Sequence, residues 1–181
     1  MKRIILSLIA AVLISTGVKA QERFGNTLNV GLGVGYYGYY YAAPALSLNY
    51  EFDVFRNFTL APFLGISSYR AYRYWGNPNY PYRDYYYRET TIPVGVKGSY
   101  YFDELLQATE KWDFYAALSL GFTFRTVQWE RDYYGDRVVR NYSSPLYANL
   151  HIGTEYHFND RAGLFLDLST GFSTLGVGFH F

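Results

Sequence analysis

Ionisable side chains recur along one polar face of the chain, and they are the residues most able to do chemistry. Because acids and bases are mixed there, they can pair as a buried charge network, relay protons or line an ion path. Unpaired charges are costly in a low-dielectric interior, so we expect pairing rather than an ion path. Lys97 is expected to bridge Glu51, Glu155 or Asp167. The predicted network consists of Glu51, Lys97, Arg125, His151, Glu155, Asp167 and His180.

Histidines raise the question of hydrolytic chemistry. Acyl-ester hydrolysis needs a serine or comparable nucleophile that a histidine activates and a carboxylate orients. No His-x-Ser pair occurs, and Thr154, three residues after His151, is expected to point to the opposite face of a strand. The sequence therefore predicts no catalytic residues. It also predicts no metal site, because neither His157 nor His180 has a neighbouring ligand at a recognisable spacing.

Two segments, residues 69–88 and 126–144, are rich in tyrosine and arginine. The first contains eight Tyr, four Arg and one Trp, with Asp84 as its only acid. Such side chains bring large contact areas with few rotors to freeze. They can bind a ligand, or they can pack on one another without one, and the sequence leaves both readings open. The candidates are Tyr69, Arg70, Arg73, Tyr74, Trp75, Arg83, Tyr86, Arg88, Trp129, Arg131, Tyr134 and Arg137.

The elements that must position these residues are strands. Apolar residues alternate with small or polar ones in segments of about ten residues, which is the period of a β-strand. Pro62 is a weak point of the third segment, because proline donates no ladder hydrogen bond. Eight strands are expected, at residues 28–36, 46–52, 58–66, 92–102, 114–125, 146–158, 164–169 and 175–181.

Connections between these strands alternate in length. Short turns are expected at residues 53–57, 103–111 and 159–161, and longer loops after the first, third and fifth strands, the largest from about residue 69 to 91. A hairpin centred on residues 134–136 is expected to carry the fifth and sixth strands outward. Membrane-spanning barrels have short turns on one side and long loops on the other. An even number of strands returns both chain ends to the short-turn side.

The two faces of the strands decide between a membrane barrel and a soluble one. The polar face is mostly Gly, Ser, Thr and Asn, which is too sparse in charge for the outside of a soluble carrier. The predicted fold is therefore all-β, an eight-stranded antiparallel up-and-down transmembrane β-barrel whose narrow lumen is filled by side chains. An aromatic girdle is expected beside the short turns, formed by Tyr50, Phe52, Phe58, Tyr100, Phe102, Phe114, Tyr156, Phe158, Phe179 and Phe181.

Residues 1–20 are expected to be a secretory signal peptide. Lys2 and Arg3 precede an apolar core, and Ala20 closes a small-residue cleavage site. The barrel domain then covers residues 21–181. The whole chain has 16 basic and 15 acidic side chains, and the signal peptide removes three basic ones and no acid, so the mature charge is −2. That balance argues against nucleic-acid binding.

Alternation in the final strand ends on Phe181, with Phe179 two residues earlier. This ending resembles the closing strand of bacterial outer-membrane β-barrels, in which a terminal Phe is part of the signal read by the outer-membrane assembly machinery. In strand count, polarity and C-terminus, the mature chain resembles the small barrels of the OmpA/OmpX type. The resemblance implies a place in the cell outer membrane, among its lipids and lipopolysaccharide.

That architecture serves many functions, so the resemblance says little about activity. The expected role is non-enzymatic, either structural or in surface recognition through the Tyr/Arg-rich loops. Arg can pair with lipopolysaccharide phosphates and Tyr can stack on sugars, and a protein could also be the ligand. A barrel of this kind could instead be a narrow channel or a lipid A modifying enzyme. No cofactor is expected.

Overall fold

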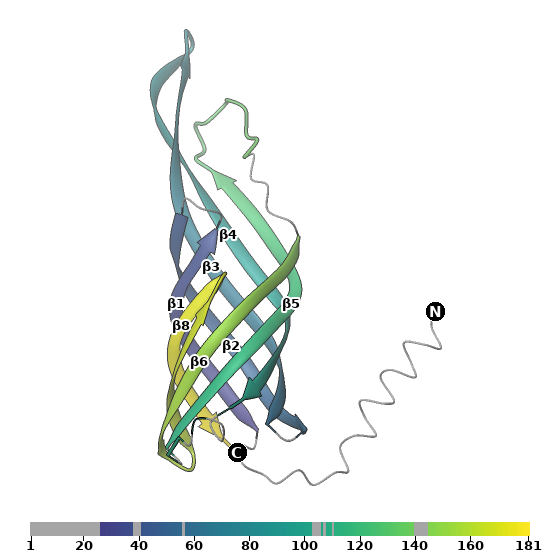
Figure 1. Cartoon of the computed structure of the whole chain (residues 1–181). Coiled ribbons are helices and arrows are strands. Elements are labelled where there is room, and N and C mark those ends of the chain that lie inside the picture. The colour runs from purple at the N-terminus through teal and green to yellow at the C-terminus, as the bar shows by residue number, and fades with distance from the viewer. Residues whose placement is uncertain are drawn as a thin grey trace, which may run out of the picture.

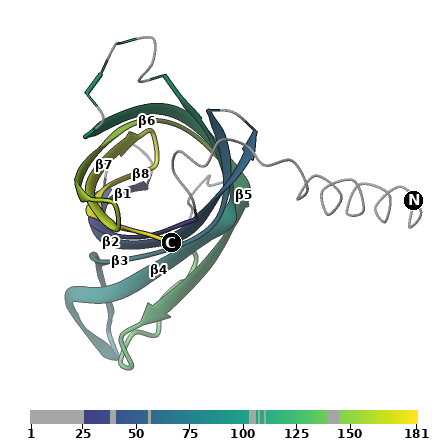
Figure 2. The same cartoon turned by 90° about the horizontal axis from the view of Figure 1, so that it is seen from below.

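The computed structural model is a closed barrel of eight antiparallel strands (Figure 1). It describes residues 26–37, 41–55, 57–102, 106, 108–109, 111–139 and 145–181. Each strand pairs with the next along the chain, and β1 pairs with β8, which closes the ring seen from below in Figure 2. The predicted fold class is confirmed. The strands are β1 (Thr27–Tyr37), β2 (Tyr41–Phe55), β3 (Phe58–Asn77), β4 (Tyr80–Tyr101), β5 (Trp112–Trp129), β6 (Leu146–Asn159), β7 (Ala162–Ser169) and β8 (Phe172–His180).

Apolar side chains point away from the barrel axis, and polar ones point into the lumen. Leu118 and Leu150 are 46% and 65% exposed, whereas Lys97 and Glu155 are 6% and 5% exposed. The alternation therefore places oily side chains outside and charges inside, which is the reverse of a soluble barrel. No helix among the described residues is long and apolar enough to cross a membrane.

Short turns join the strands at one end of the barrel. β2 passes to β3 through Asn57, whose φ of 59° lies in the left-handed region that Asn tolerates. The β6–β7 turn is held by Asn159 Oδ1, which accepts a hydrogen bond from the Arg161 amide at 2.9 Å. Much of the third predicted turn, residues 103–111, lies outside the described residues. Pro62 lies within β3. The pairing of β3 with β2 is interrupted there, between the Asn49–Phe63 and Phe52–Leu60 pairs.

The prediction of a long loop at residues 69–91 is wrong. β3 and β4 continue as a hairpin as far as the Asn77–Tyr80 pair, with a register shift after Trp75, and this hairpin rises well beyond the other strands in Figure 1. Tyrosine and arginine make up most of residues 69–88, so a search for apolar–polar alternation does not detect a strand. Aromatic residues nevertheless favour the extended backbone.

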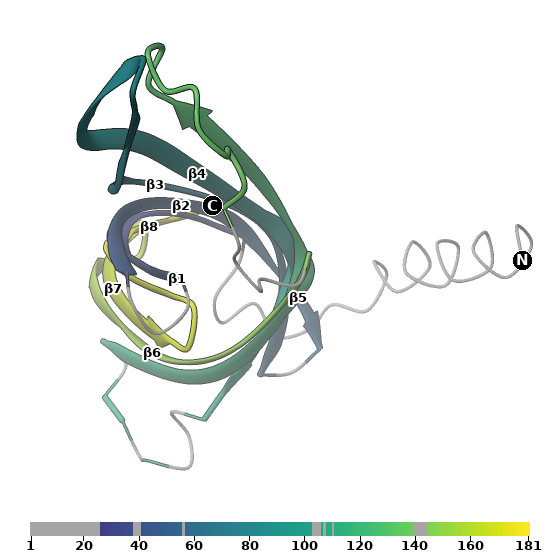
Figure 3. The same cartoon turned by 90° about the horizontal axis from the view of Figure 1, so that it is seen from above.

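The hairpin predicted at residues 134–136 is also corrected. β5 does continue outward, but it pairs with β4, ending at the Tyr87–Trp129 pair, and β6 begins only at Leu146. Residues 130–139 form an irregular segment beside this three-stranded sheet (Figure 3). The rest of the predicted loop, residues 140–144, lies outside the described residues. We call residues 69–91 and 126–139 together the extension.

The C-terminal strand ends one residue earlier than predicted. β8 stops at His180, and the Phe181 amide donates a hydrogen bond to the Asn26 carbonyl at 2.9 Å. The side chains of Phe179 and Phe181 are exposed on the outer surface, as are Tyr50, Tyr100 and Phe158 of the predicted girdle. The predicted signal peptide, residues 1–20, lies outside the described residues.

Candidate functional site

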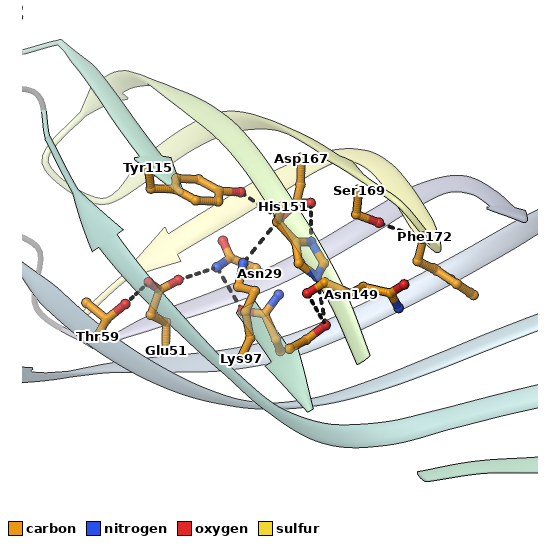
Figure 4. Close-up of polar contacts among 12 residues, drawn as sticks. Asn29, Glu51, Thr59, Lys97, Tyr115, Asn149, His151, Asp167, Ser169 and Phe172 are labelled. Atoms are coloured by element: carbon orange, nitrogen blue, oxygen red, sulfur yellow. Dashed lines mark hydrogen bonds and ion pairs between the residues drawn. The ribbon is translucent and has the colours of Figure 1, made fainter. Parts of the chain in front are cut away.

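A cluster of charged and hydroxyl side chains fills the middle of the lumen (Figure 4). Lys97 Nζ on β4 lies 3.3 Å from Asp167 Oδ2 on β7, and both side chains are buried. Tyr115 donates a hydrogen bond to the same oxygen at 2.8 Å, and its ring lies 4.8 Å from the ammonium. Of the three carboxylates expected for Lys97, the structure therefore selects Asp167. We call Lys97, Tyr115, Ser119, His151 and Asp167 the central network.

Ser119, His151 and Asp167 are joined in one chain of contacts. Ser119 Oγ lies 2.8 Å from His151 Nε2, and His151 Nδ1 lies 2.7 Å from Asp167 Oδ1. The order of groups is that of a Ser-His-Asp catalytic triad. No spacing along the chain predicts this arrangement, because it depends on the β5–β6 register, which sets Ser119 opposite Asn149, two residues from His151.

Space around this serine is small. Ser119 is 1% exposed, and the cavity that it lines with Lys97 and His151 has a volume of about 40 Å³. That volume holds a few water molecules at most. The arrangement can therefore share a proton between the three groups, but it offers no room for an acyl chain.

Glu51 is held apart from the basic residues of the lumen. It accepts hydrogen bonds from Tyr101 at 2.8 Å, from Asn29 at 3.3 Å and from Thr59. Glu51 therefore has three neutral hydrogen-bond donors as partners, in place of the Lys97 ammonium that was one predicted partner. Three hydrogen bonds to a buried carboxylate lower the cost of keeping it charged.

Arg125 forms its own ion pair towards the extension. Its Nη2 lies 2.6 Å from Glu89 Oε2, and its Nε also contacts that carboxylate. Tyr69 donates a hydrogen bond to the same group at 2.6 Å, so this loop candidate lies on the inward face. Glu89 was not predicted to be part of the lumen network, because it was assigned to a loop rather than to a strand.

Two histidines and two acids meet inside the barrel at the end with the short turns. His180 Nε2 lies 3.0 Å from Glu155 Oε1, and His157 Nε2 lies 2.6 Å from Asp113 Oδ2. The two imidazole rings are 4.9 Å apart. Along the chain neither histidine has a neighbouring ligand at a recognisable spacing, but the barrel brings β5, β6 and β8 together here. We call Asp113, Glu155, His157 and His180 the histidine cluster.

One face of the extension is a small aromatic core. Tyr133, from the irregular segment, is fully buried and stacks on Trp129 with ring centroids 4.4 Å apart. Trp75 and Tyr85 pack against its ring at 5.3 and 5.4 Å. This face therefore fits the reading in which the aromatic side chains pack on one another. We call it the inner face.

Arg73 holds the irregular segment to the inner face, and Arg137 forms a contact within the segment. Arg73 donates hydrogen bonds to the Asp136 and Val138 carbonyls, each at 3.1 Å, and Arg137 donates to the Tyr133 carbonyl at 3.0 Å. These two predicted ligand-binding arginines thus have partners within the extension.

A surface ion pair adds to this attachment. Arg83 Nη2 lies 2.6 Å from Glu130 Oε1. The hydrogen bond from Arg83 lowers the pKa of Glu130, and the same bond raises the pKa of Arg83. Arg83 is exposed and Glu130 is partly exposed, so the pair contributes little to stability.

The opposite face of the β3–β4 hairpin is exposed, and we call it the outer face. Arg70 on β3 pairs directly with Arg88 on β4, and Tyr72 pairs with Tyr86. The Arg70 guanidinium lies over the Tyr86 ring at 4.8 Å. Tyr74 follows on the same face and is exposed. Elsewhere in the extension, Arg131 is exposed, and Tyr134 stacks on Tyr80 at 4.5 Å.

No protein-family model and no curated protein sequence matches the chain. Among solved structures it is similar to Ail, the attachment invasion locus protein of Yersinia pestis, in complex with the heparin analogue sucrose octasulfate. The TM-score is 0.50 with 8% identity over 86% of this chain and 96% of that one. A de novo designed transmembrane β-barrel matches with a TM-score of 0.46 and 12% identity over 84% and 93% of the two chains. At these identities the likeness concerns the fold, and this chain has the fold of the small eight-stranded outer-membrane β-barrel proteins.

Proposed function

We propose that this chain is a non-enzymatic barrel of the bacterial outer membrane that recognises anionic glycans through its outer face. The fold and the outward belt of apolar side chains support the membrane location. Under that location the short turns face the periplasm and the extension faces the outside. Outer-membrane lipid and lipopolysaccharide surround the barrel, and Phe179 and Phe181 contribute to the signal for the assembly machinery.

The observation that carries the proposal is the direct pairing of Arg70 with Arg88. Like charges directly opposite each other on a sheet are destabilising. The neighbour of Arg88 on its other side is Gln128, so within the described pairings no acid lies directly opposite either arginine. Arg83 and Arg125, by contrast, each contact a glutamate. The exposed arginine pair is therefore suited to an external anion.

The next pair along the hairpin favours a sugar as the carrier of that anion. Tyr72 and Tyr86 present exposed aromatic rings beside the two guanidinium groups. A guanidinium can bind a sulfate or phosphate through two parallel hydrogen bonds, and aromatic faces pack against sugar rings. The structure of Ail was solved with a heparin analogue, which belongs to the same ligand class. Sulfated polysaccharides and lipopolysaccharide phosphates share this chemistry.

Binding of the folded barrel to anionic glycans tests the proposal. The double variant Arg70→Gln/Arg88→Gln is expected to bind immobilised heparin at least about tenfold more weakly, because hydrogen bonds to charged groups contribute about 1.5–3 kcal/mol each. Parallel titrations with lipopolysaccharide and with its dephosphorylated form distinguish the two glycan sources. The control Lys111→Gln/Arg161→Gln removes two charges at the other end of the barrel and should bind normally. Equal affinity in the two double variants would refute the proposal.

We also propose that the Ser119–His151–Asp167 contacts are structural rather than catalytic. The small cavity supports this, as does Asp167, which also binds Lys97 and Tyr115 and so anchors three groups. A fluorophosphonate probe, which reacts with activated serines, is expected not to label the folded barrel. Labelling that disappears in Ser119→Ala would instead assign a nucleophile and favour a lipid-modifying enzyme.

A further inference from the structure

We propose that the histidine cluster is a binding site for a divalent metal ion of the zinc class, with Glu155, His157 and His180 as ligands. One carboxylate oxygen and one ring nitrogen from each histidine lie within 4.8 Å of one another. Zinc binds imidazole nitrogen and carboxylate oxygen at about 2.0–2.2 Å, so small side-chain rotations bring all three atoms onto one ion. This proposal goes beyond glycan recognition and does not depend on it.

Each histidine already has the second contact that metal-binding histidines make. His180 Nδ1 lies 2.9 Å from Thr27 Oγ1 on β1, while its Nε2 faces Glu155. His157 Nε2 contacts Asp113 Oδ2 on β5, which leaves Nδ1 for a metal ion. A carboxylate or hydroxyl on the other ring nitrogen fixes the ring and its tautomer. Asp113 and Thr27 are therefore positioning residues.

Charge at this end of the lumen also favours a cation. Asp113 and Glu155 are directly opposite each other on β5 and β6, and both side chains are buried. Two acids in this relation repel each other unless a positive charge lies between them. A divalent ion supplies that charge with the imidazoles neutral, which is the form that binds metals.

Two glycines make the space for the Glu155 carboxylate. Gly163 on β7 and Gly178 on β8 are directly paired beside it. A Cβ atom at Gly178 would lie 2.5 Å from Glu155 Oε1, and one at Gly163 would overlap the same oxygen. The His157 side chain is 19% exposed, so the cluster is in contact with solvent.

A bound ion would join strands that do not pair with each other. Glu155 and His157 lie on β6 and His180 lies on β8, with β7 between them. Through Thr27 and Asp113 the site also reaches β1 and β5. The site therefore clamps the closing strand β8 to the rest of the barrel, next to the chain terminus.

Isothermal titration of the folded, tag-free barrel with Zn²⁺ tests the site. We expect saturable uptake of one equivalent, Co²⁺ absorption bands typical of nitrogen and oxygen ligands, and no competition from Mg²⁺, which prefers oxygen ligands. Binding should be lost in His157→Gln/His180→Gln. It should weaken about 10–100-fold in Asp113→Asn, the usual loss when a positioning residue is removed.

Controls separate loss of the ligands from loss of the fold. His151→Gln removes the histidine outside the cluster and should bind Zn²⁺ as the parent does. Gly163→Ala displaces the Glu155 side chain and no backbone atom, so the barrel should fold while its affinity for Zn²⁺ falls. Absence of saturable uptake by the parent barrel would overturn the proposal. So would an unchanged affinity in folded His157→Gln/His180→Gln.

Discussion

Replacing Lys97 by methionine is expected to lower the free energy of unfolding of the barrel by about 3 kcal/mol, at the lower end of the range for removing one partner of a buried ion pair. The side chains of Lys97 and Asp167 are only 7% and 6% exposed, and they connect β4 to β7 across the lumen. Methionine fills a similar volume, so the loss comes from the charge. Asp167 keeps His151 and Tyr115 as partners, which limits the cost.

A second substitution isolates the charge effect. In Lys97→Met/Asp167→Asn the uncompensated carboxylate is gone, so this double variant should be more stable than Lys97→Met alone. Lys111→Met removes an exposed lysine and should leave stability unchanged. Urea titration of the folded barrel in detergent, followed by tryptophan fluorescence, gives the free energies. Equal unfolding midpoints for the parent and Lys97→Met would show that the pairing contributes nothing.

The sequence predicts the part of this fold that depends on alternation alone. Leu118 and Leu150 are directly next in sequence to residues that face the lumen, so the strand period decides which face each one takes. The number of strands and the short turn at Asn57 follow from the same pattern. What alternation does not give is the register between strands. Ser119 and His151 are 32 residues apart, and only the β5–β6 register shows that they touch.

The residues at both ends of the lumen were only partly predicted, because the strands extend beyond the apolar runs. Asp113 and Glu89 lie just beyond the apolar runs, so Asp113 fell between the predicted turn and the predicted strand, and Glu89 fell in the predicted loop. In the structure both are in strands and point inward, where they pair with His157 and Arg125. An inward position continues past the apolar run because the backbone remains extended. A search for acids one or three residues outside each run, in phase with the polar face, would have found them.

Replacing Tyr133 by alanine is expected to release residues 130–139 from the inner face without unfolding the barrel. Tyr133 is fully buried, stacks on Trp129, and donates a hydrogen bond to the Asp136 carbonyl at 2.8 Å. Removing a buried aromatic side chain costs about 3–5 kcal/mol. The remaining side-chain attachments are Arg73, the Arg83–Glu130 pair and the stack of Tyr134 on Tyr80, which are partly or fully exposed and contribute less.

Trypsin measures this release, because Arg131 and Arg137 are exposed. The Tyr133→Ala barrel should be cut within residues 130–139 far faster than the parent, while the transmembrane strands remain protected. Tyr133→Phe keeps the ring and should lose only about 1 kcal/mol, and Val138→Ala removes an exposed side chain and should behave as the parent does. Unchanged cleavage in Tyr133→Ala would show that the segment is held by other contacts.

The same variant separates the two faces of the extension. Arg70 and Arg88 lie in a hairpin that keeps its own backbone pairing and its ladder to β5. Release of residues 130–139 should therefore leave heparin binding unchanged if the outer face alone recognises the glycan. If Tyr133→Ala loses binding as Arg70→Gln/Arg88→Gln does, the ligand contacts the irregular segment as well. Exposed Arg131 and Tyr134 would then be the residues to replace next.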